Sequence, residues 1–304
     1  MVGLDAKIEE ISDGVYMIDP CLFDSMGYIA LYFVTQPKRI LFDVGPSVTA
    51  ERVIRAIETL GYRGDQIDYL FVSHVHVEHS GGISKIASWA SNSKIVVSPA
   101  SVRHLQDPSK MYQAYTNYYG RFGPLIGDYQ PLSQSSMLRV ISTLTELPLG
   151  DRRGRIIQCA GHAHHQVCLQ LDGSLFGADI LSTQFRINDQ LLPTSTPPSF
   201  NYPKYTEDLD TALALNLDRL MISHYGVFDN PTEIITKALD SLKWLRHQVE
   251  SLLKEGLLAD EVADTLLKGL NCIPSVDNEY AYIKAKLSLI GFINGVIKVR
   301  SEKV

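Results

Sequence analysis

Hydrophobic residues in the first part of the chain gather in short runs that predict strands. The runs at 14–19, 28–35 and 39–45 are rich in β-branched and aromatic residues, and polar or turn-forming residues separate them. Such runs are typical of strands joined by hairpins. Residues 49–60 instead carry apolar side chains at helical spacing, and a glycine follows them. This pattern predicts a helix that ends at the glycine.

Strand and helix patterns alternate after this point. Residues 67–74 predict a strand, 81–90 a helix and 94–99 another strand. This alternation indicates a layered α/β fold, in which helices pack over a sheet. Further strands are predicted at 155–160, 167–173, 174–181 and 219–226.

A tyrosine-rich segment, residues 101–136, interrupts this rhythm. Tyr112, Tyr115 and Tyr119 fall on one face if the segment is helical. That face either packs on the core or belongs to a lid over a site, because long connections are often functional. The sequence leaves both alternatives open.

The pattern becomes helical after residue 228. An Asn-Pro pair fits the N-cap and first residue of a helix, and apolar residues then keep a helical period to about residue 256. Two further helices are predicted at 259–270 and 277–299. We therefore expect two domains, residues 1–228 and an α-helical extension formed by residues 229–304.

Composition and charge narrow the classes of function. Of 304 residues, 45% are hydrophobic and 20% are charged, which is an ordinary globular balance. The net charge of −6 disfavours a nucleic-acid partner, because such proteins usually present a basic face to phosphates. Four cysteines without C-x-x-C spacing indicate buried thiols in a reducing compartment.

Two further observations predict a cytoplasmic protein without a membrane partner. The N-terminus carries acidic residues where a signal peptide would need an apolar run. The apolar stretch at 287–297 is interrupted by polar residues and glycine, and it is about half as long as a membrane span. We expect it to be a packed helix.

The segment "SHVHVEHSGG", residues 73–82, contains candidate metal ligands directly after a predicted strand. Residues two apart on an extended chain point to the same side, so His74 and His76 can bind one ion. Glu78 keeps this parity if the chain stays extended, whereas His79 faces elsewhere, toward a second ion. Imidazole and carboxylate ligands suit zinc, iron or manganese.

Three more ligand-type residues follow apolar runs at the ends of predicted strands. They are His162, Asp179 and His224. Strand ends at one edge of a sheet converge, so separate loops can assemble one site.

The motifs "ILFDVG", "HVHVEH", "AGH", "FGADIL" and "SHYG" occur in an order that resembles the metallo-β-lactamase-fold metallohydrolases. Their spacing is most similar to the glyoxalase II and lactonase-like branch, and the resemblance covers about residues 8–228. It implies a four-layer αβ/βα sandwich with a metal centre at one edge and, here, an appended C-terminal helical segment.

The resemblance also implies a role for each candidate ligand. Asp179 would bridge two metal ions, and Asp43 would support the histidine loop by accepting a hydrogen bond that orients a ligand. The first ion would be held by His74, His76 and His162, and the second by Glu78, His79 and His224.

Two departures from the family pattern stand out. Glu78 occupies a position where the family usually has aspartate, and its extra methylene displaces the carboxylate by more than the ~0.2 Å tolerance of a coordination distance. A weaker second site, a single ion or a metal other than zinc therefore stays open. The motif "GHAHHQ" replaces the more common GHTxGH, and we expect His164 and His165 to be supporting or surface residues rather than ligands.

The resemblance implies hydrolysis of a small-molecule thioester, ester or lactone with one or two zinc ions, iron or manganese being alternatives. A bound metal ion lowers the pKa of water towards ~7, and Asp179 or Glu78 could relay a proton to the leaving group. A mononuclear iron dioxygenase and a phosphodiesterase or nuclease of the same fold are the alternative activities. The helical extension would shape the substrate pocket, form a homodimer interface or only cover an apolar face.

Overall fold

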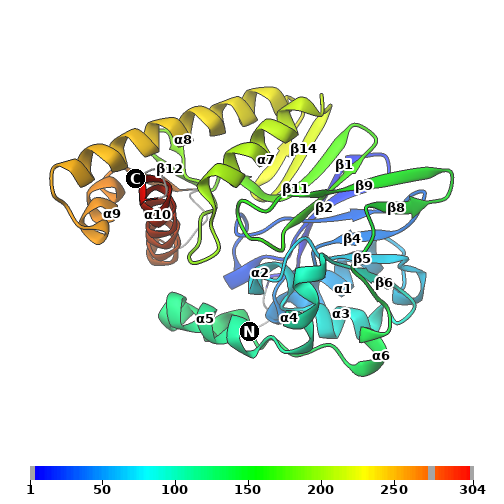
Figure 1. Cartoon of the computed structure of the whole chain (residues 1–304). Helices are drawn as coiled ribbons and strands as arrows, with labels where there is room; N and C mark the ends of the chain where they lie inside the picture. The colour runs from blue at the N-terminus through cyan, green and yellow to red at the C-terminus, as the bar shows by residue number, and fades with distance from the viewer. Residues whose placement is uncertain (1–3, 273–277, 302–304) are drawn as a thin grey trace. The chain divides into compact units, whose positions relative to one another are not determined.

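The computed structural model describes residues 4–272 and 278–301. The described part of the chain divides into two compact units (Figure 1). The first unit comprises the residues up to Ile157 together with Val167–Leu171, and the second comprises Gln158–Gln166 and the residues from Asp172 onward. The predicted domain boundary at residue 228 stays a prediction.

The first unit contains a seven-stranded sheet whose spatial order follows the chain order from β1 to β7. The first four strands are antiparallel neighbours, and the last four are parallel neighbours. The strands β3, β4 and β5 are buried along their whole length, as expected where both faces of a sheet are covered. The bounds are β1 (Lys7–Ser12), β2 (Val15–Asp19), β3 (Leu31–Val34), β4 (Ile40–Phe42), β5 (Tyr69–Phe71), β6 (Lys94–Val96) and β7 (Val140–Ile141).

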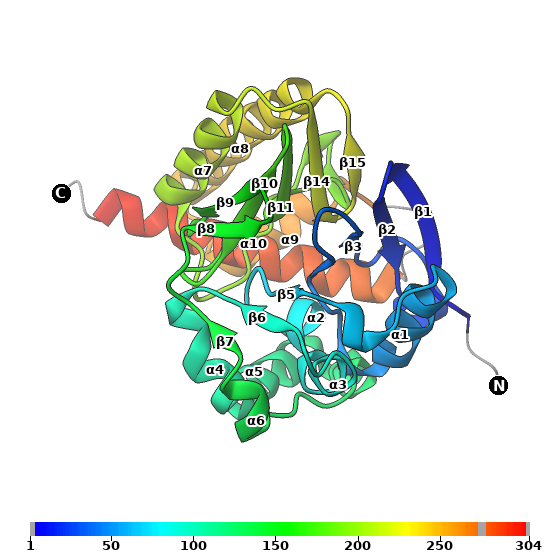
Figure 2. The same cartoon turned by 90° about the vertical axis from the view of Figure 1, so that its right-hand side faces the viewer.

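Helices of the first unit pack by their apolar faces. In α1, Val53, Ile54 and Ile57 are buried, which confirms the predicted amphipathic helix, and α1 contacts α3 (Figure 2). The α-helices are α1 (Ala50–Thr59), α2 (Val77–Ser80), α3 (Ile83–Trp89), α4 (Val102–Gln106), α5 (Ser109–Tyr119) and α6 (Gln134–Met137). Short 3₁₀-helices are η1 (Leu22–Asp24), η2 (Ser47–Thr49), η3 (Gly64–Gln66), η4 (Pro99–Ser101), η5 (Gly120–Phe122) and η6 (Pro124–Ile126).

The tyrosine-rich segment is helical at α5, which meets the condition on which the shared tyrosine face depended. Tyr115 and Tyr119 are buried, and their rings stack with centroids 4.3 Å apart. The helix also contacts α2. Of the two alternatives for this face, packing in the interior therefore holds for Tyr115 and Tyr119.

The first unit also holds the strands β8 (Glu146–Leu149), β9 (Arg152–Gln158) and β10 (Val167–Leu171). The strands β8 and β9 form an antiparallel hairpin, whose turn contains Gly150 with φ +68°. Glycine reaches this left-handed backbone conformation without a steric penalty. In their sheet, β9 lies between β8 and β10.

The second unit is built around the parallel pair β11 (Ser174–Ser182) and β14 (Arg219–His224). Parallel strands need a crossover connection, and here it contains α7 (Tyr202–Ala214). The strand β15 (Gly226–Phe228) pairs antiparallel with β14. A small antiparallel sheet has β12 (Phe185–Ile187) between β13 (Gln190–Leu191) and β16 (Leu270–Cys272).

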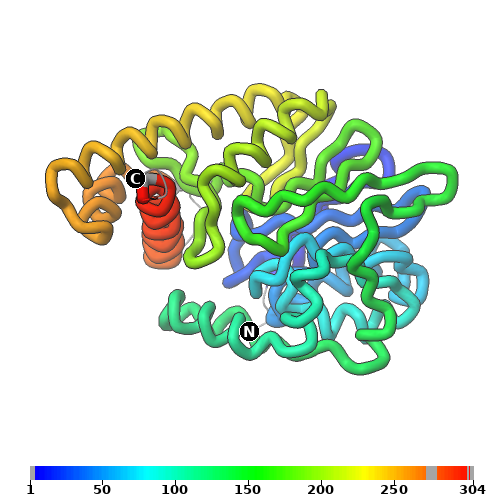
Figure 3. Tube along the Cα trace, viewed as in Figure 1, coloured from blue at the N-terminus to red at the C-terminus, as the bar shows by residue number. Residues whose placement is uncertain are grey.

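Helices α8 (Pro231–Lys254), α9 (Ala259–Leu267) and α10 (Asn278–Ser301) confirm the predicted helical pattern after residue 228. Helix α10 packs against α7, α8 and α9 within the second unit. Figure 3 traces α10 in red as a Cα tube. The apolar stretch at 287–297 belongs to α10, so it is the packed helix that we expected. None of the helices in the described ranges combines the length and the apolar character that crossing a membrane requires.

Candidate metal centre

The histidine segment begins where β5 ends. His74 and His76 lie side by side, with ring centroids 4.6 Å apart and 3.1 Å between His74 Nε2 and His76 Nδ1. The two imidazoles therefore share a side of the chain, as the spacing predicts. The chain then turns into α2 at Val77, so Glu78 lies on a helix rather than on the extended segment.

Asp43 organises this segment from the end of β4. Its backbone is left-handed, with φ +58°, and its side chain is fully buried. One carboxylate oxygen accepts the Ser73 backbone N–H at 2.8 Å. The other accepts the Ser73 hydroxyl at 2.8 Å and the His79 Nδ1–H at 2.9 Å. Asp43 thus forms hydrogen bonds of the orienting kind expected for it.

These hydrogen bonds set the tautomers of two histidines. The Ser73 hydroxyl donates its proton to Asp43, so it accepts from His74 Nδ1, 2.9 Å away. His79 Nδ1 likewise donates to Asp43. An imidazole that donates from Nδ1 keeps its lone pair on Nε2. His74 and His79 therefore offer Nε2 to a cation.

Helix α2 is docked by backbone bonds and by one tyrosine. The His79 carbonyl accepts hydrogen bonds from the N–H groups of Val44 and Gly45, at 2.9 and 3.2 Å. The Ser80 hydroxyl donates to the His76 carbonyl and accepts from the Tyr129 hydroxyl, 2.7 Å away. Burial raises the pKa of Tyr129, so the phenol stays neutral and remains a donor.

The second unit brings together two histidines and an aspartate. His162 Nε2 lies 3.5 Å from Asp179 Oδ2, and His224 Nε2 lies 3.6 Å from the same oxygen. All three side chains are buried. His162 Nδ1 donates to the Thr194 carbonyl at 2.7 Å. His162 therefore also keeps its lone pair on Nε2.

Hydrogen bonds from Thr194 and Tyr205 support His162 and Asp179. The Thr194 hydroxyl donates to the Asp179 backbone carbonyl at 2.6 Å, so it accepts from the Tyr205 hydroxyl, 3.1 Å away. Burial raises the pKa of Tyr205, which keeps this phenol protonated. The threonine backbone thus orients His162 while its side chain fixes the strand end that carries Asp179.

Helix α7 holds the loop that carries His162. Asp208 accepts the Gly161 backbone N–H at 2.7 Å. A Cβ at Gly161 would collide with the Tyr205 backbone, so only glycine allows this approach. Burial raises the pKa of Asp208 to about 6, although the hydrogen bond from Gly161 opposes the shift.

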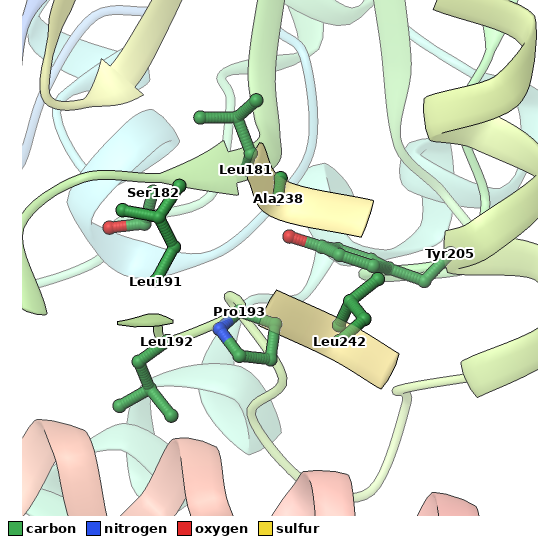
Figure 4. Close-up of a pocket in the computed structure, with 8 residues that line it drawn as sticks. All are labelled: Leu181, Ser182, Leu191, Leu192, Pro193, Tyr205, Ala238 and Leu242. Atoms are coloured by element: carbon green, nitrogen blue, oxygen red, sulfur yellow. The ribbon is translucent and has the colours of Figure 1, made fainter. Parts of the chain in front are cut away.

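A small pocket lies beside this network in the second unit. Its lining is mostly apolar, and its free volume of about 10 Å³ is the room of a single water molecule. A small-molecule site usually measures ~300–1,000 Å³, so this pocket does not hold a substrate. Figure 4 shows the lining residues Leu181, Ser182, Leu191, Leu192, Pro193, Tyr205, Ala238 and Leu242.

Lys284 is the one cationic side chain that the described hydrogen bonds place on His224. Its Nζ lies 3.4 Å from His224 Nδ1 and 3.3 Å from Nε2, and the lysine is only 7% exposed. Lys284 belongs to α10. The helical extension therefore contributes a charged group next to a candidate ligand.

Sequence reasoning missed several of these residues. Ser73, Thr194, Tyr205 and Asp208 carry no local signal, because each has a partner at least 11 positions away in the sequence. Lys284 could have been noticed, since a lysine on the apolar face of a helix is unusual. Of the two extra histidines, His165 is buried and His164 is exposed.

Histidine and carboxylate side chains able to hold a metal ion are thus present in both units. Within the first unit they are joined through Asp43, and within the second through Asp179. Of the four predicted buried thiols, Cys21, Cys159 and Cys168 are confirmed, and the side chain of Cys272 lies outside the described part of the chain.

Three comparisons place the chain among known proteins. The family model described as "Metallo-beta-lactamase superfamily" matches residues 22–224. A curated relative, the metallo-β-lactamase fold-containing protein ST1585 of Sulfurisphaera tokodaii, is 26% identical over 167 residues. That alignment covers 54% of this chain and 62% of the relative, so the sequence match spans less than two thirds of the relative's length.

Solved structures resemble the chain over most of its length. The archaeal metallo-β-lactamase superfamily protein ST1585 from Sulfolobus tokodaii has a TM-score of 0.67 at 20% identity, covering 94% of this chain and 98% of that chain. The metallo-β-lactamase family protein TTHA1429 from Thermus thermophilus has a TM-score of 0.68 at 14% identity. The match covers 97% of this chain and 95% of that chain. These similarities confirm the expected fold class, an α/β sandwich of the metallo-β-lactamase type with an appended C-terminal helical segment.

Proposed function

The chain belongs to the metallo-β-lactamase superfamily, and on that premise we propose that it is a metal-dependent hydrolase of a small-molecule thioester, ester or lactone. One observation carries the proposal. In His74, His79 and His162, Nδ1 donates to an oxygen atom, so each ring carries its lone pair on Nε2, the atom that would bind a cation. Histidines prepared in this way are typical of metal sites.

The donor chemistry suits zinc, with iron or manganese as alternatives. Each candidate ligand is a histidine or a carboxylate, and the set lacks the thiolates that would favour softer ions. We assign one ion to His74, His76 and His162, and the second position to Glu78, His79 and His224. Asp179 would contact both.

A bound metal ion would lower the pKa of a coordinated water to near neutrality and polarise the substrate carbonyl. The protein's own groups supply the rest. Asp43 and Thr194 fix the imidazole orientations, and the buried carboxylates of Asp179 and Glu78 would relay a proton to the leaving group.

The order and spacing of the five motifs support the glyoxalase II and lactonase-like branch, which is why thioesters and lactones lead the substrate classes. A glutamate in the centre has a parallel among the solved structures of this fold. One is described as the first B3 metallo-β-lactamase with an active-site glutamic acid, at 14% identity and a TM-score of 0.55. A small-molecule partner also agrees with the net charge of −6, which disfavours nucleic acid.

Glu78 also favours a second candidate function, a mononuclear iron dioxygenase. Two histidines and one carboxylate form the facial triad of such enzymes, and the candidate ligands include both kinds of side chain. This alternative predicts iron rather than zinc in the purified protein, together with oxygen consumption.

Metal content and a substrate panel test the proposal. Protein purified without added metal is analysed for zinc, iron and manganese and assayed on thioesters, lactones and phosphodiesters, before and after chelation. We expect bound metal and chelator-sensitive hydrolysis of a thioester, ester or lactone. Iron with oxygen uptake and no hydrolysis would favour the dioxygenase, and metal-free protein that still hydrolyses the panel would contradict both.

A further inference from the structure

Lys284 is a buried cation on the helical extension. It lies on the same face of α10 as the buried residues Ala281, Ala285 and Ser288, a face that otherwise carries small or apolar side chains. Lysine is rarely this buried unless a partner compensates the charge. Its partner here is His224, through contacts to both ring nitrogens.

The position of this ammonium group matters because His224 is a proposed ligand. Asp179 Oδ2 lies 3.6 Å from His224 Nε2, so the negative charge of Asp179 is close to the same ring. The Lys284 ammonium group and the Asp179 carboxylate thus both lie against the His224 ring, and the ammonium group brings to that ring a positive charge of the kind that a metal ion would bring. Burial removes most of the solvent screening.

We propose that Lys284 takes the place of the second metal ion, so that the centre binds one divalent cation and the Lys284 ammonium acts as its second positive charge. This inference rests on the proposed function. A divalent ion on His224 would lie within a few ångströms of a buried ammonium group, and the two like charges repel.

Glu78 also weakens the binding of a second metal ion. It belongs to the second ligand set, and its side chain is one methylene longer than that of the usual aspartate, so the loop must adjust to bring the carboxylate to a coordination distance. That adjustment and the competing cation both weaken the second position. Neither affects the first ligand set directly.

The fold holds Lys284 firmly in place. The Ser195 hydroxyl donates to the Ser288 backbone carbonyl at 2.7 Å, one turn along α10 from Lys284. A Cβ at Gly291 would collide with the Ser195 carbonyl oxygen, so α10 lies in close contact with this loop. Because helix α10 is fixed at these points, the backbone that carries Lys284 is held in place.

Metal stoichiometry tests the proposal with a readout that does not depend on activity. We titrate three metal-free proteins with Co²⁺ and follow visible absorption: wild type, Lys284→Met and Lys284→Arg. In a second measurement, each protein is dialysed against Zn²⁺, and elemental analysis gives the number of bound ions per chain. Lys286→Met is the matched control, because Lys286 lies on the same helix and pairs with the exposed carboxylate of Asp264. Circular dichroism verifies that each variant is folded.

We expect one bound metal ion per chain in wild type, Lys284→Arg and Lys286→Met, and two in Lys284→Met. The second ion should bind to Lys284→Met at least tenfold more tightly than to wild type. Two equivalents in wild type, or one in a folded Lys284→Met, would overturn the inference while leaving the proposed metal-dependent function intact. If Lys284→Met does not fold, the neutral variant Lys284→Gln takes its place, and one bound metal ion per chain in folded Lys284→Gln would likewise overturn the inference. No bound metal in any variant would overturn both proposals.

Discussion

Asp43 and His79 are joined by a hydrogen bond of 2.9 Å between a carboxylate oxygen and Nδ1 in a fully buried environment. The same carboxylate binds Ser73, which in turn binds His74. Two histidines of the candidate centre therefore depend on one aspartate for their tautomer and orientation. This relationship leads to the first prediction.

Replacing Asp43 with asparagine should weaken metal binding by about 10- to 100-fold without unfolding the protein. The amide can still accept one hydrogen bond, but it cannot accept from Ser73 and His79 with the strength of a carboxylate. Competition with a chelator measures the affinity. The control is Asp65→Asn, an exposed aspartate on η3, and equal affinities for the two variants would contradict the orienting role.

Replacing His76 with alanine should abolish hydrolysis and lower the metal content while leaving the fold intact. The His76 side chain is only partly buried, so its removal leaves a small cavity and costs little stability. Elemental analysis and thermal unfolding measure the two effects separately. Retained turnover in a folded variant would count against His76 as a ligand.

Asp208 should make stability depend on pH. Its folded-state pKa of about 6 lies above the ordinary aspartate value of about 3.9, so the native state binds the proton more tightly than the unfolded state. The contribution of this group to stability is therefore fully present below about pH 4 and is lost as the pH rises through about 6.

Replacing Asp208 with asparagine should remove that dependence, because the amide oxygen still accepts from Gly161 but does not titrate. Relative to the variant, the wild type should lose up to about 3 kcal/mol between pH 4 and 7. Urea unfolding at several pH values measures the difference. The control Asp210→Asn changes an exposed residue on the same helix, so its stability should depend on pH as that of the wild type does. If the stability of Asp208→Asn also kept the wild-type pH dependence, Asp208 would not be the group responsible.

Replacing Gly291 with alanine should destabilise the protein by about 1–3 kcal/mol, although alanine is the better helix former by about 1 kcal/mol. The added methyl group would meet the Ser195 carbonyl oxygen and separate α10 from the 193–202 segment. The neighbouring Thr194 orients His162, so metal affinity should fall as well. Denaturant unfolding and chelator competition measure both.

Asn294→Ala serves as the matched control for Gly291→Ala, because residue 294 is exposed on the same helix. This change should leave stability within about 0.5 kcal/mol of the wild type. A stabilising effect of Gly291→Ala would show that α10 does not approach Ser195 closely.

Most of the elements could be predicted from local patterns. Hydrophobic patterns predict the strands around β4 and β5, helix α1 and the three helices after residue 228. These patterns are informative because the apolar side chains of each element are the ones that packing buries. The pairing of His74 with His76 also follows from spacing alone. Helix α2 could not be predicted, because four residues are too few to show a period and their conformation depends on bonds from Val44, Gly45 and Tyr129.

By itself, the sequence determined the kinds of ligand, their order along the chain and the superfamily, because these depend on residue type and on short spacings. The resemblance also predicted that Asp43 orients the histidine loop, but only the tertiary structure decided which histidine it holds and which other groups take part. Asp43 reaches His79 across 36 positions, and Lys284 reaches His224 across 60. No local pattern encodes such pairs, since the distance between two side chains far apart in sequence is set by the packing of whole elements.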